Sequence, residues 1–125
     1  MKHESHFTSG MVAHLREKLG GSVVFKHSDQ LTAGVPDTSV TWRRSTTWLE
    51  VKIKRSGAIT TDSLQDTNMR RLAAAGKNAF YVIFGEGSTE IIHPRDDSPL
   101  VQSGIYQDYR LVVMFIRRMH GDTTS

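Results

Sequence analysis

Apolar residues recur at helical spacing near the start of the chain. Those between positions 4 and 19 fall on one face of a helix: Phe7, Met11, Val12, Leu15 and Leu19. Gly20 and Gly21 follow at once, and glycine commonly ends a helix. The pattern predicts a first helix over residues 4–19.

Runs of β-branched and aromatic residues predict strands in the remainder of the chain. They lie at residues 22–28, 37–42, 47–53, 78–85 and 88–94. The sequence RRST, between the second and third of these, is expected to form a tight exposed turn. The fourth run is continuously apolar, which is typical of a strand buried on both faces.

Two further helices complete the predicted order. Thr61 or Asp62 is a candidate cap for a helix that runs to about Ala75 and is closed by Gly76. After a loop rich in proline and aspartate, a last helix is expected over residues 106–119. The order of helix, three strands, helix, two strands and helix describes an α/β fold, in which helices flank a small mixed β-sheet.

The third predicted strand carries charges where apolar residues are usual. Side chains alternate along a strand, so Leu49, Val51 and Ile53 point to one face. Glu50 and Lys52 therefore share the other face, where an acid and a base lie two residues apart.

Asp37 is expected at the same place in the predicted hairpin. A hairpin across the turn brings the start of the second strand opposite the end of the third, so Asp37 lies near Glu50 and Lys52. Two close carboxylates repel each other when empty and suit a hard divalent cation such as Mg²⁺. A lysine beside them can orient a water molecule or stabilise charge on a phosphate oxygen.

The two helices before the apolar strand also direct polar residues inward. At about 100° per residue, Glu4 lies near the centre of the apolar face of the first helix, whereas Glu17 lies on the opposite side. Gln65 lies on the same side of the second helix as Met69 and Leu72. Both helices are therefore expected to contribute to a site near the hairpin.

Each of these residues also has a purely structural interpretation. Asp37 follows a proline and suits a turn, and Glu4 suits the positive end of a helix dipole. Glu50 and Lys52 suit the exposed face of an edge strand, and Gln65 suits a partly exposed helix position. Their conjunction, in this order and spacing, favours a functional site.

Composition bounds the class of protein. The 125 residues are 38% hydrophobic and 23% charged, which fits one folded domain, expected over residues 1–120 with a flexible tail at 121–125. There is no cysteine, which excludes disulfides, thiolate zinc sites and cysteine nucleophiles. With no signal-peptide pattern and no long apolar run, we expect a cytoplasmic protein without a membrane span.

Charge gives a weaker indication. Lys and Arg number 16 against 13 Asp and Glu, and the net charge of +3 permits a polyanionic partner without requiring one. A solvated surface would look much the same. Arg43, Arg44, Lys54 and Arg55 are expected to cluster beside the acidic residues and to contact phosphates.

Together, these motifs resemble a known nuclease superfamily. GVPD, the glutamate of LEVK thirteen residues after Asp37, and SLQ at the start of the next helix are similar to the PD-(D/E)xK nucleases. The similarity is to the VRR-NUC branch and to archaeal-type Holliday junction resolvases, and it covers residues 4–84. It implies a restriction-endonuclease-like core of order αβββαβ, with an extra strand and a C-terminal helix. One departure is that the family often has LSxxQ, whereas TDSLQ has Ser63 only two residues before Gln65.

The resemblance implies a metal site and a catalytic lysine. In that family, Mg²⁺ or Mn²⁺ is held by residues that correspond to Asp37, Glu50 and the backbone carbonyl of Val51. Lys52 corresponds to the lysine that positions or activates the attacking water.

Three further roles follow from the resemblance alone. Glu4 corresponds to a glutamate that contributes to the metal site directly or through water. Gln65 corresponds to a glutamine that supports the lysine and the substrate. Ser28 matches a serine that contacts phosphate in some resolvases.

The implied reaction is metal-assisted hydrolysis of a DNA phosphodiester, which leaves a 3′-hydroxyl and a 5′-phosphate. A chain of this size has no room for a further DNA-reading domain, so recognition by shape rather than by sequence is expected. The resemblance to symmetric resolvases implies a homodimer that cuts opposed strands of a four-way junction. The apolar helix at 111–119 is a candidate dimer surface, or it packs on the sheet. The alternatives are a nuclease that acts on flaps, nicks or foreign DNA, and a catalytically silent DNA-binding module. The intact acidic and basic motif argues against the silent module.

Overall fold

One mixed β-sheet runs through the part of the chain that the structure describes. The computed structural model describes residues 4–27, 35–59, 63–76, 78–95 and 98–122. The sheet has seven strands in the order β1-β2-β3-β5-β6-β7, with β4 paired to β3. The strands are β1 (Val23–Lys26), β2 (Thr38–Trp42), β3 (Ser45–Arg55), β4 (Ala58–Ile59), β5 (Asn78–Gly85), β6 (Ser88–Ile92) and β7 (Pro99–Ser103). The helices in the described ranges are α1 (Glu4–Lys18), α2 (Ser63–Ala74) and α3 (Tyr109–Met119), so the α/β fold is confirmed.

β3 is the longest strand and determines the topology. It forms an antiparallel hairpin with β2 and pairs in parallel with β5 on its other side. Parallel neighbours need a crossover connection, and the segment that holds α2 provides it. The remaining pairs in the row, β1 with β2, β5 with β6 and β6 with β7, are antiparallel.

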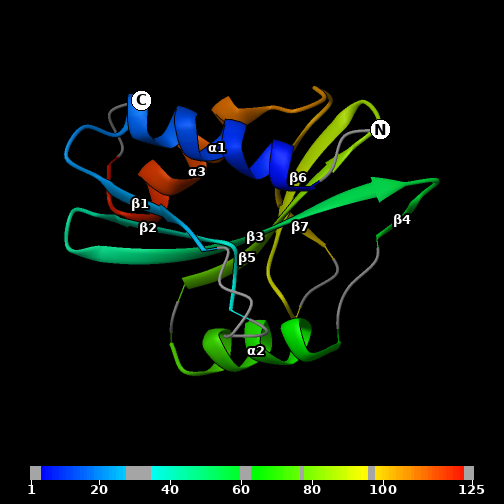
Figure 1. Ribbon diagram of the computed structural model, residues 1–125, viewed down its shortest axis with the longest axis horizontal. Helices are drawn as coiled ribbons and strands as arrows, with labels where there is room; N and C mark the ends of the chain where they lie inside the picture. Colours follow the sequence, from blue (N-terminus) through cyan, green and yellow to red (C-terminus); the bar gives the residue numbers. More distant parts are fainter. Residues whose placement is uncertain (1–3, 28–34, 60–62, 77, 96–97, 123–125) are drawn as a thin grey trace.

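The helices divide the core into two layers. α1 and α3 lie on one face of the sheet, and α2 lies on the other (Figure 1). The larger core, between the sheet and α1 and α3, includes Leu49 and Val51 of β3. The smaller core contains Met69 of α2 and Tyr81 of β5, and Trp48 packs against it. The alternation predicted for the third strand is therefore confirmed.

The ends of several elements differ from the predictions. β1 is four residues long rather than seven, and α3 begins at Tyr109 rather than at residue 106. The side chain of Asp108 caps α3 by accepting a hydrogen bond from the backbone N–H of Leu111 at 3.2 Å. The predicted caps of α2, Thr61 and Asp62, lie outside the described residues.

The β2–β3 turn is shorter than predicted. It contains only Arg43 and Arg44, because Trp42 already pairs with Ser45. Both arginines have positive φ, 52° and 68°, as a two-residue turn with the right twist for a hairpin requires.

Two strands were not predicted from the pattern. β4 has two residues, and β7 lies in the expected loop and starts at Pro99. β7 is an edge strand, where proline is tolerated because no neighbour needs its missing N–H.

α3 uses its apolar residues within the chain. Leu111, Val112, Val113, Phe115 and Ile116 are all buried. They join the larger core, which favours the second interpretation of this helix, packing on the sheet. A dimer remains a prediction.

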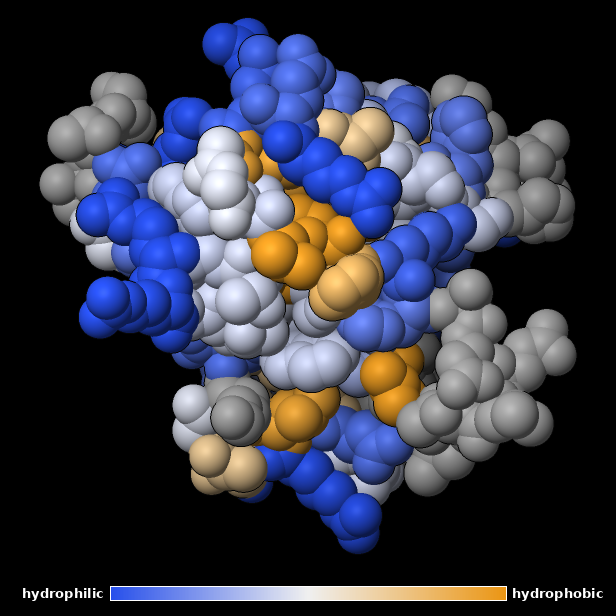
Figure 2. Space-filling view, turned by 60° about the vertical axis from the view of Figure 1, so that its left-hand side comes forward, coloured by the Kyte–Doolittle hydropathy of each residue, from blue (hydrophilic) through white to orange (hydrophobic). Residues whose placement is uncertain are grey.

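The surface carries a few large apolar residues. Those that are exposed are Val23, Phe25, Leu100, Ile105 and Tyr106. Figure 2 shows hydrophobic residues reaching the surface in separate patches among hydrophilic ones. None of the helices in the described ranges combines the length and hydropathy needed to cross a membrane.

Candidate metal and catalytic site

The site lies where β2 ends and β3 continues. The β2–β3 pairing runs from the turn to Thr38 opposite Leu49 and stops there. Among the described strands, β3 then pairs only with β5 until Lys54, where β4 begins. One backbone edge of β3, from Glu50 to Ile53, is therefore left without a partner strand, and the residue that precedes β2 lies beside it.

Asp37 occupies this open edge. One carboxylate oxygen, Oδ2, accepts a hydrogen bond from the backbone N–H of Val51 at 3.1 Å, and Oδ1 accepts from the hydroxyl of Thr38 at 3.1 Å. The N–H and C=O of one strand residue point to the same side. The carbonyl of Val51 therefore faces the side of β3 on which Asp37 lies.

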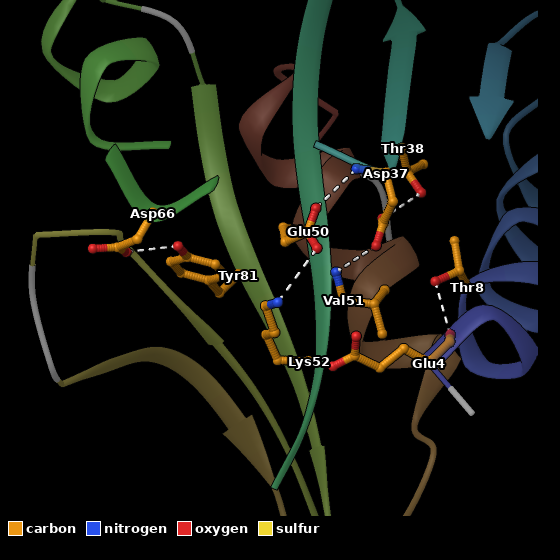
Figure 3. A network of polar contacts seen from close by, with 9 residues as sticks. All are labelled: Glu4, Thr8, Asp37, Thr38, Glu50, Val51, Lys52, Asp66 and Tyr81. Carbon is orange, nitrogen blue, oxygen red and sulfur yellow. Dashed lines mark hydrogen bonds and ion pairs between the residues drawn. The ribbon is translucent and has the colours of Figure 1, made fainter. Parts of the chain in front are cut away.

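Glu50 is held next to Asp37 by a reciprocal contact. Its Oε1 accepts a hydrogen bond from the backbone N–H of Asp37 at 2.9 Å. Its Oε2 lies 3.7 Å from Nζ of Lys52. Glu50 and Lys52 are only 3% and 5% exposed, so neither lies on a solvated strand face. The structure thus brings together the three residues of the motif, as Figure 3 shows.

The electrostatics of this group are unfavourable for two bare carboxylates. Burial, and next the negative charge of Asp37, raise the pKa of Glu50 to about 8, against the opposing effect of Lys52. Burial also raises the pKa of Asp37 to about 6, although the hydrogen bond from Val51 opposes the shift. A nearby divalent cation would reverse both effects, because it favours the charged form.

Glu4 adds to the negative charge. It is the first residue of α1, and its backbone carbonyl accepts a hydrogen bond from the hydroxyl of Thr8 at 2.9 Å. Figure 3 shows its carboxylate directed from α1 toward β3. Its charge contributes to the raised pKa values of both Asp37 and Glu50. Glu4 is nevertheless exposed, as is Glu17, which was predicted to face solvent and whose side chain is 70% exposed.

The donor set fits a hard cation, although it is small. In the described part of the chain, no three Asp, Glu or His side chains gather as a metal-binding group. Asp37, Glu50 and the carbonyl of Val51 offer oxygen ligands at one edge, and Mg²⁺ commonly keeps several waters besides one or two carboxylates. Asp37 and Glu50 together carry one carboxylate more than the single ammonium group of Lys52 can pair, and Glu4 adds negative charge from α1.

Two predicted site residues cannot be located by their side chains. Gln65 lies in the first turn of α2, but its side chain is not described. Ser28 lies outside the described residues.

The basic residues separate into two groups. Lys54 and Arg55 follow Lys52 at the end of β3, beside the site. Arg43 and Arg44 lie at the other end of the hairpin, beyond the Trp42–Ser45 pair, which is itself four residues and thus roughly 13 Å from Thr38 along the strand. The expectation that all four cluster beside the carboxylates is therefore wrong for these two, because a turn at one end of a hairpin is far from its open end. Arg43 instead lies 3.8 Å from Asp122 and over the ring of Trp42.

Tyr81 and Asp66 were missed by the sequence reasoning. Tyr81 of β5 is the direct neighbour of Glu50 in the sheet, and its hydroxyl donates a hydrogen bond to Oδ1 of Asp66 in α2 at 2.6 Å (Figure 3). Burial raises the pKa of the Tyr81 hydroxyl, and the contact with Asp66 raises it further. A tyrosine in a strand buried on both faces needs a polar partner for its hydroxyl. The position of Tyr81 in the apolar run of residues 78–85 was therefore the sequence feature that could have indicated such a contact.

Comparisons of the sequence with known proteins add no evidence to the geometry of this site. Neither the protein-family models nor the curated proteins contain a match to this chain.

Proposed function

We propose that this chain is a metal-dependent endodeoxyribonuclease with a restriction-endonuclease-like core. The observation that carries the proposal is the group at the open edge of β3 formed by the half-buried Asp37 with the buried Glu50 and Lys52. A structural ion pair needs one carboxylate for each ammonium, and a buried excess of carboxylates destabilises the fold. Where more carboxylates than ammonium groups are held close together by hydrogen bonds, a cation-binding site is expected.

Each residue has a distinct part in the proposed reaction. Asp37 and Glu50, with the carbonyl of Val51, would hold Mg²⁺ or Mn²⁺, and Glu4 would contribute from α1, directly or through water. When bound, the ion would polarise the phosphate and lower the pKa of a water molecule. Lys52 orients the water and stabilises negative charge on a phosphate oxygen. The water oxygen would lose a proton to solvent and bond to phosphorus as the bond to the 3′ oxygen breaks. The 3′ oxygen would take up a proton from solvent, which leaves a 3′-hydroxyl and a 5′-phosphate.

Branched DNA is the proposed substrate, and a four-way junction cut by a homodimer is the leading form. Lys54 and Arg55 beside the site suit phosphates, which carry no sequence information. A twofold protein suits a twofold substrate. A flap or a nick is the alternative substrate. The chain has no cysteine, and we place the activity in the cytoplasm.

The test compares DNA shapes with and without metal. Labelled four-way junction, flap, linear duplex and single strand are incubated with the protein in Mg²⁺ and in chelator. We expect symmetric nicks near the junction centre in Mg²⁺ only, lost in Asp37→Asn and Lys52→Ala. The matched control is Glu17→Gln, which removes an exposed carboxylate of α1 and should cut normally.

Two results would count against the proposal. Equal cutting of linear duplex would remove the structure selectivity. Binding of junctions without any cutting, in Mg²⁺ or in Mn²⁺, would instead support a catalytically silent DNA-binding module.

A further inference from the structure

Three aromatic side chains form a row on the α2 face of the sheet, beside the candidate site. Phe25, His27 and Trp48 make up this aromatic row. The ring centroids of Phe25 and His27 are 6.2 Å apart, and those of His27 and Trp48 are 5.3 Å apart. Phe25 is 57% exposed.

The strand register explains the row. Phe25, Ser39 and Trp48 are direct neighbours across β1, β2 and β3. Ser39 is small, and the ring of His27 lies above it, with Nε2 2.8 Å from the Ser39 hydroxyl. The next residue back in β1, Val24, points the other way and is buried in the larger core. The row is therefore outside the larger core.

A pocket adjoins the Trp48 end of the row. It has a volume of about 400 Å³, and residues of α2 and the segment before β2 line it, including Pro36, Trp48, Asn68, Arg71 and Leu72. The lining is mainly apolar, with one amide and one guanidinium. This is the usual composition of a pocket that binds a flat organic group and fixes it with a few polar contacts.

The row and the pocket are both tied to the acidic residues. The backbone N–H of His27 donates a hydrogen bond to the carbonyl of Asp37 at 2.7 Å. Trp48 precedes Glu50 by two residues on the same strand face, and Pro36 immediately precedes Asp37. A group held in the pocket is therefore close to the carboxylates.

We infer that the aromatic row and this α2 pocket bind unpaired nucleotides of the DNA strand next to the cleavage site. Bases of any sequence stack on aromatic rings, which suits recognition by shape rather than by sequence. The exposed Arg71 is placed to contact a phosphate of the same strand. The inference rests on the proposed function and refines its substrate: a junction or flap whose strand is unstacked at the cut.

The first test measures binding in chelator, so that no cutting is needed. A fluorescein-labelled 12-residue oligo(dT) and a hairpin duplex of similar length are titrated with protein, and anisotropy is recorded. We expect tighter binding of oligo(dT) than of the duplex. Phe25→Leu should weaken oligo(dT) binding about tenfold, and Arg71→Gln should weaken it several-fold.

Matched controls remove equivalent groups elsewhere. Leu100→Ala changes an exposed apolar residue on β7, the opposite edge of the sheet, and Arg110→Gln changes an exposed arginine of α3. Both should leave the affinity for oligo(dT) unchanged. Because Phe25 is largely exposed, its variant should keep the wild-type circular dichroism spectrum.

Two outcomes overturn the inference. The first is a Phe25→Leu affinity equal to that of Leu100→Ala. The second is that the wild-type protein is a dimer, that Phe25→Leu is a monomer, and that both bind oligo(dT) equally. This result would show that the aromatic row is a protein interface. Metal-dependent cutting together with either outcome would leave the proposed function standing. If oligo(dT) binding depends on Phe25 and Arg71 but no DNA is cut, the proposed nuclease activity is contradicted and the proposed binding surface is supported.

Discussion

Asp37 and Glu50 position each other through the backbone. The Glu50 carboxylate accepts a hydrogen bond from the backbone N–H of Asp37 at 2.9 Å, and the Asp37 carboxylate accepts one from the backbone N–H of Val51, next to Glu50, at 3.1 Å. This reciprocal arrangement fixes two ligands before an ion binds, so that little ordering remains to oppose binding. It also keeps two carboxyl groups close together, one buried and one half-buried, and this determines how the protein should respond to pH.

We expect the metal-free protein to lose stability as the pH rises. Folding raises the pKa of Asp37 to about 6 and that of Glu50 to about 8, above their values in the unfolded chain. A carboxyl group whose pKa is raised on folding stabilises the fold fully at pH values below its pKa in the unfolded chain, which is near 4. This stabilisation decreases as the pH rises further and is lost above the pKa in the folded protein. Urea denaturation in chelator should show an unfolding free energy lower by roughly 2 kcal/mol or more at pH 9 than at pH 5.

Two comparisons check the origin of this effect. Glu50→Gln should flatten the profile, whereas Glu17→Gln should not. Added Mg²⁺ or Mn²⁺ should stabilise the protein more at pH 9 than at pH 5, because the cation binds the charged carboxylates. A stability that rises with pH in chelator would contradict the assignment.

At this scale the sequence predicted the acidic group well. Alternation located Glu50 and Lys52 on one face, and the hairpin located Asp37 beside them. It failed for Arg43 and Arg44, since nearness along the chain was mistaken for nearness in space. It also missed Tyr81, whose relation to Glu50 depends on the parallel pairing of β3 with β5, a contact between distant segments.

Among the elements, α2 is joined to β5 by a polar contact as well as by apolar packing. The Tyr81 hydroxyl donates to Asp66, which also accepts from Nε of Arg70 at 2.9 Å. The first of these contacts is partly buried and the second is exposed. They should therefore differ in their contributions to stability.

We expect Tyr81→Phe to lower the unfolding free energy by roughly 1.5 to 3 kcal/mol, the usual value for a hydrogen bond to a charged group. Arg70→Gln, which removes the exposed partner of the same carboxylate, should cost less than about 1 kcal/mol. Urea denaturation of both variants at pH 7 measures the difference. A larger loss in Arg70→Gln would show that the Tyr81 contact does not hold α2.

Elements with strong periodicity were the predictable ones. α1 and β5 follow from helical spacing and from a continuous apolar run. β4 and β7 were not found because a two-residue strand has no period, and because Pro99 indicates a loop unless its edge position is known. The end of α3 nearest the loop was set by the cap at Asp108 rather than by the apolar pattern.

For the molecule as a whole, charge near the site matters more than the net charge of +3. Lys54 lies two residues beyond Lys52 and points to the same face of β3. Phosphate contacts release counterions, so each one adds to the salt dependence of DNA binding.

We expect Lys54→Gln to reduce the slope of log affinity against log salt by about 1 for a four-way junction, measured in chelator. Lys18→Gln is the matched control, because Lys18 ends α1 and its side chain is 53% exposed. It should leave the slope unchanged. Equal slopes for both variants and the wild type would remove Lys54 from the DNA contact.

The open edge of β3 has a consequence for solubility. An unpaired strand edge in a sheet rich in apolar residues is a template on which another chain can add a strand. Inward-pointing charges are one means by which natural sheets prevent such pairing, and Glu50 and Lys52 lie at the start of this edge. The residues proposed to cut DNA thus also discourage the chain from aggregating through its own sheet.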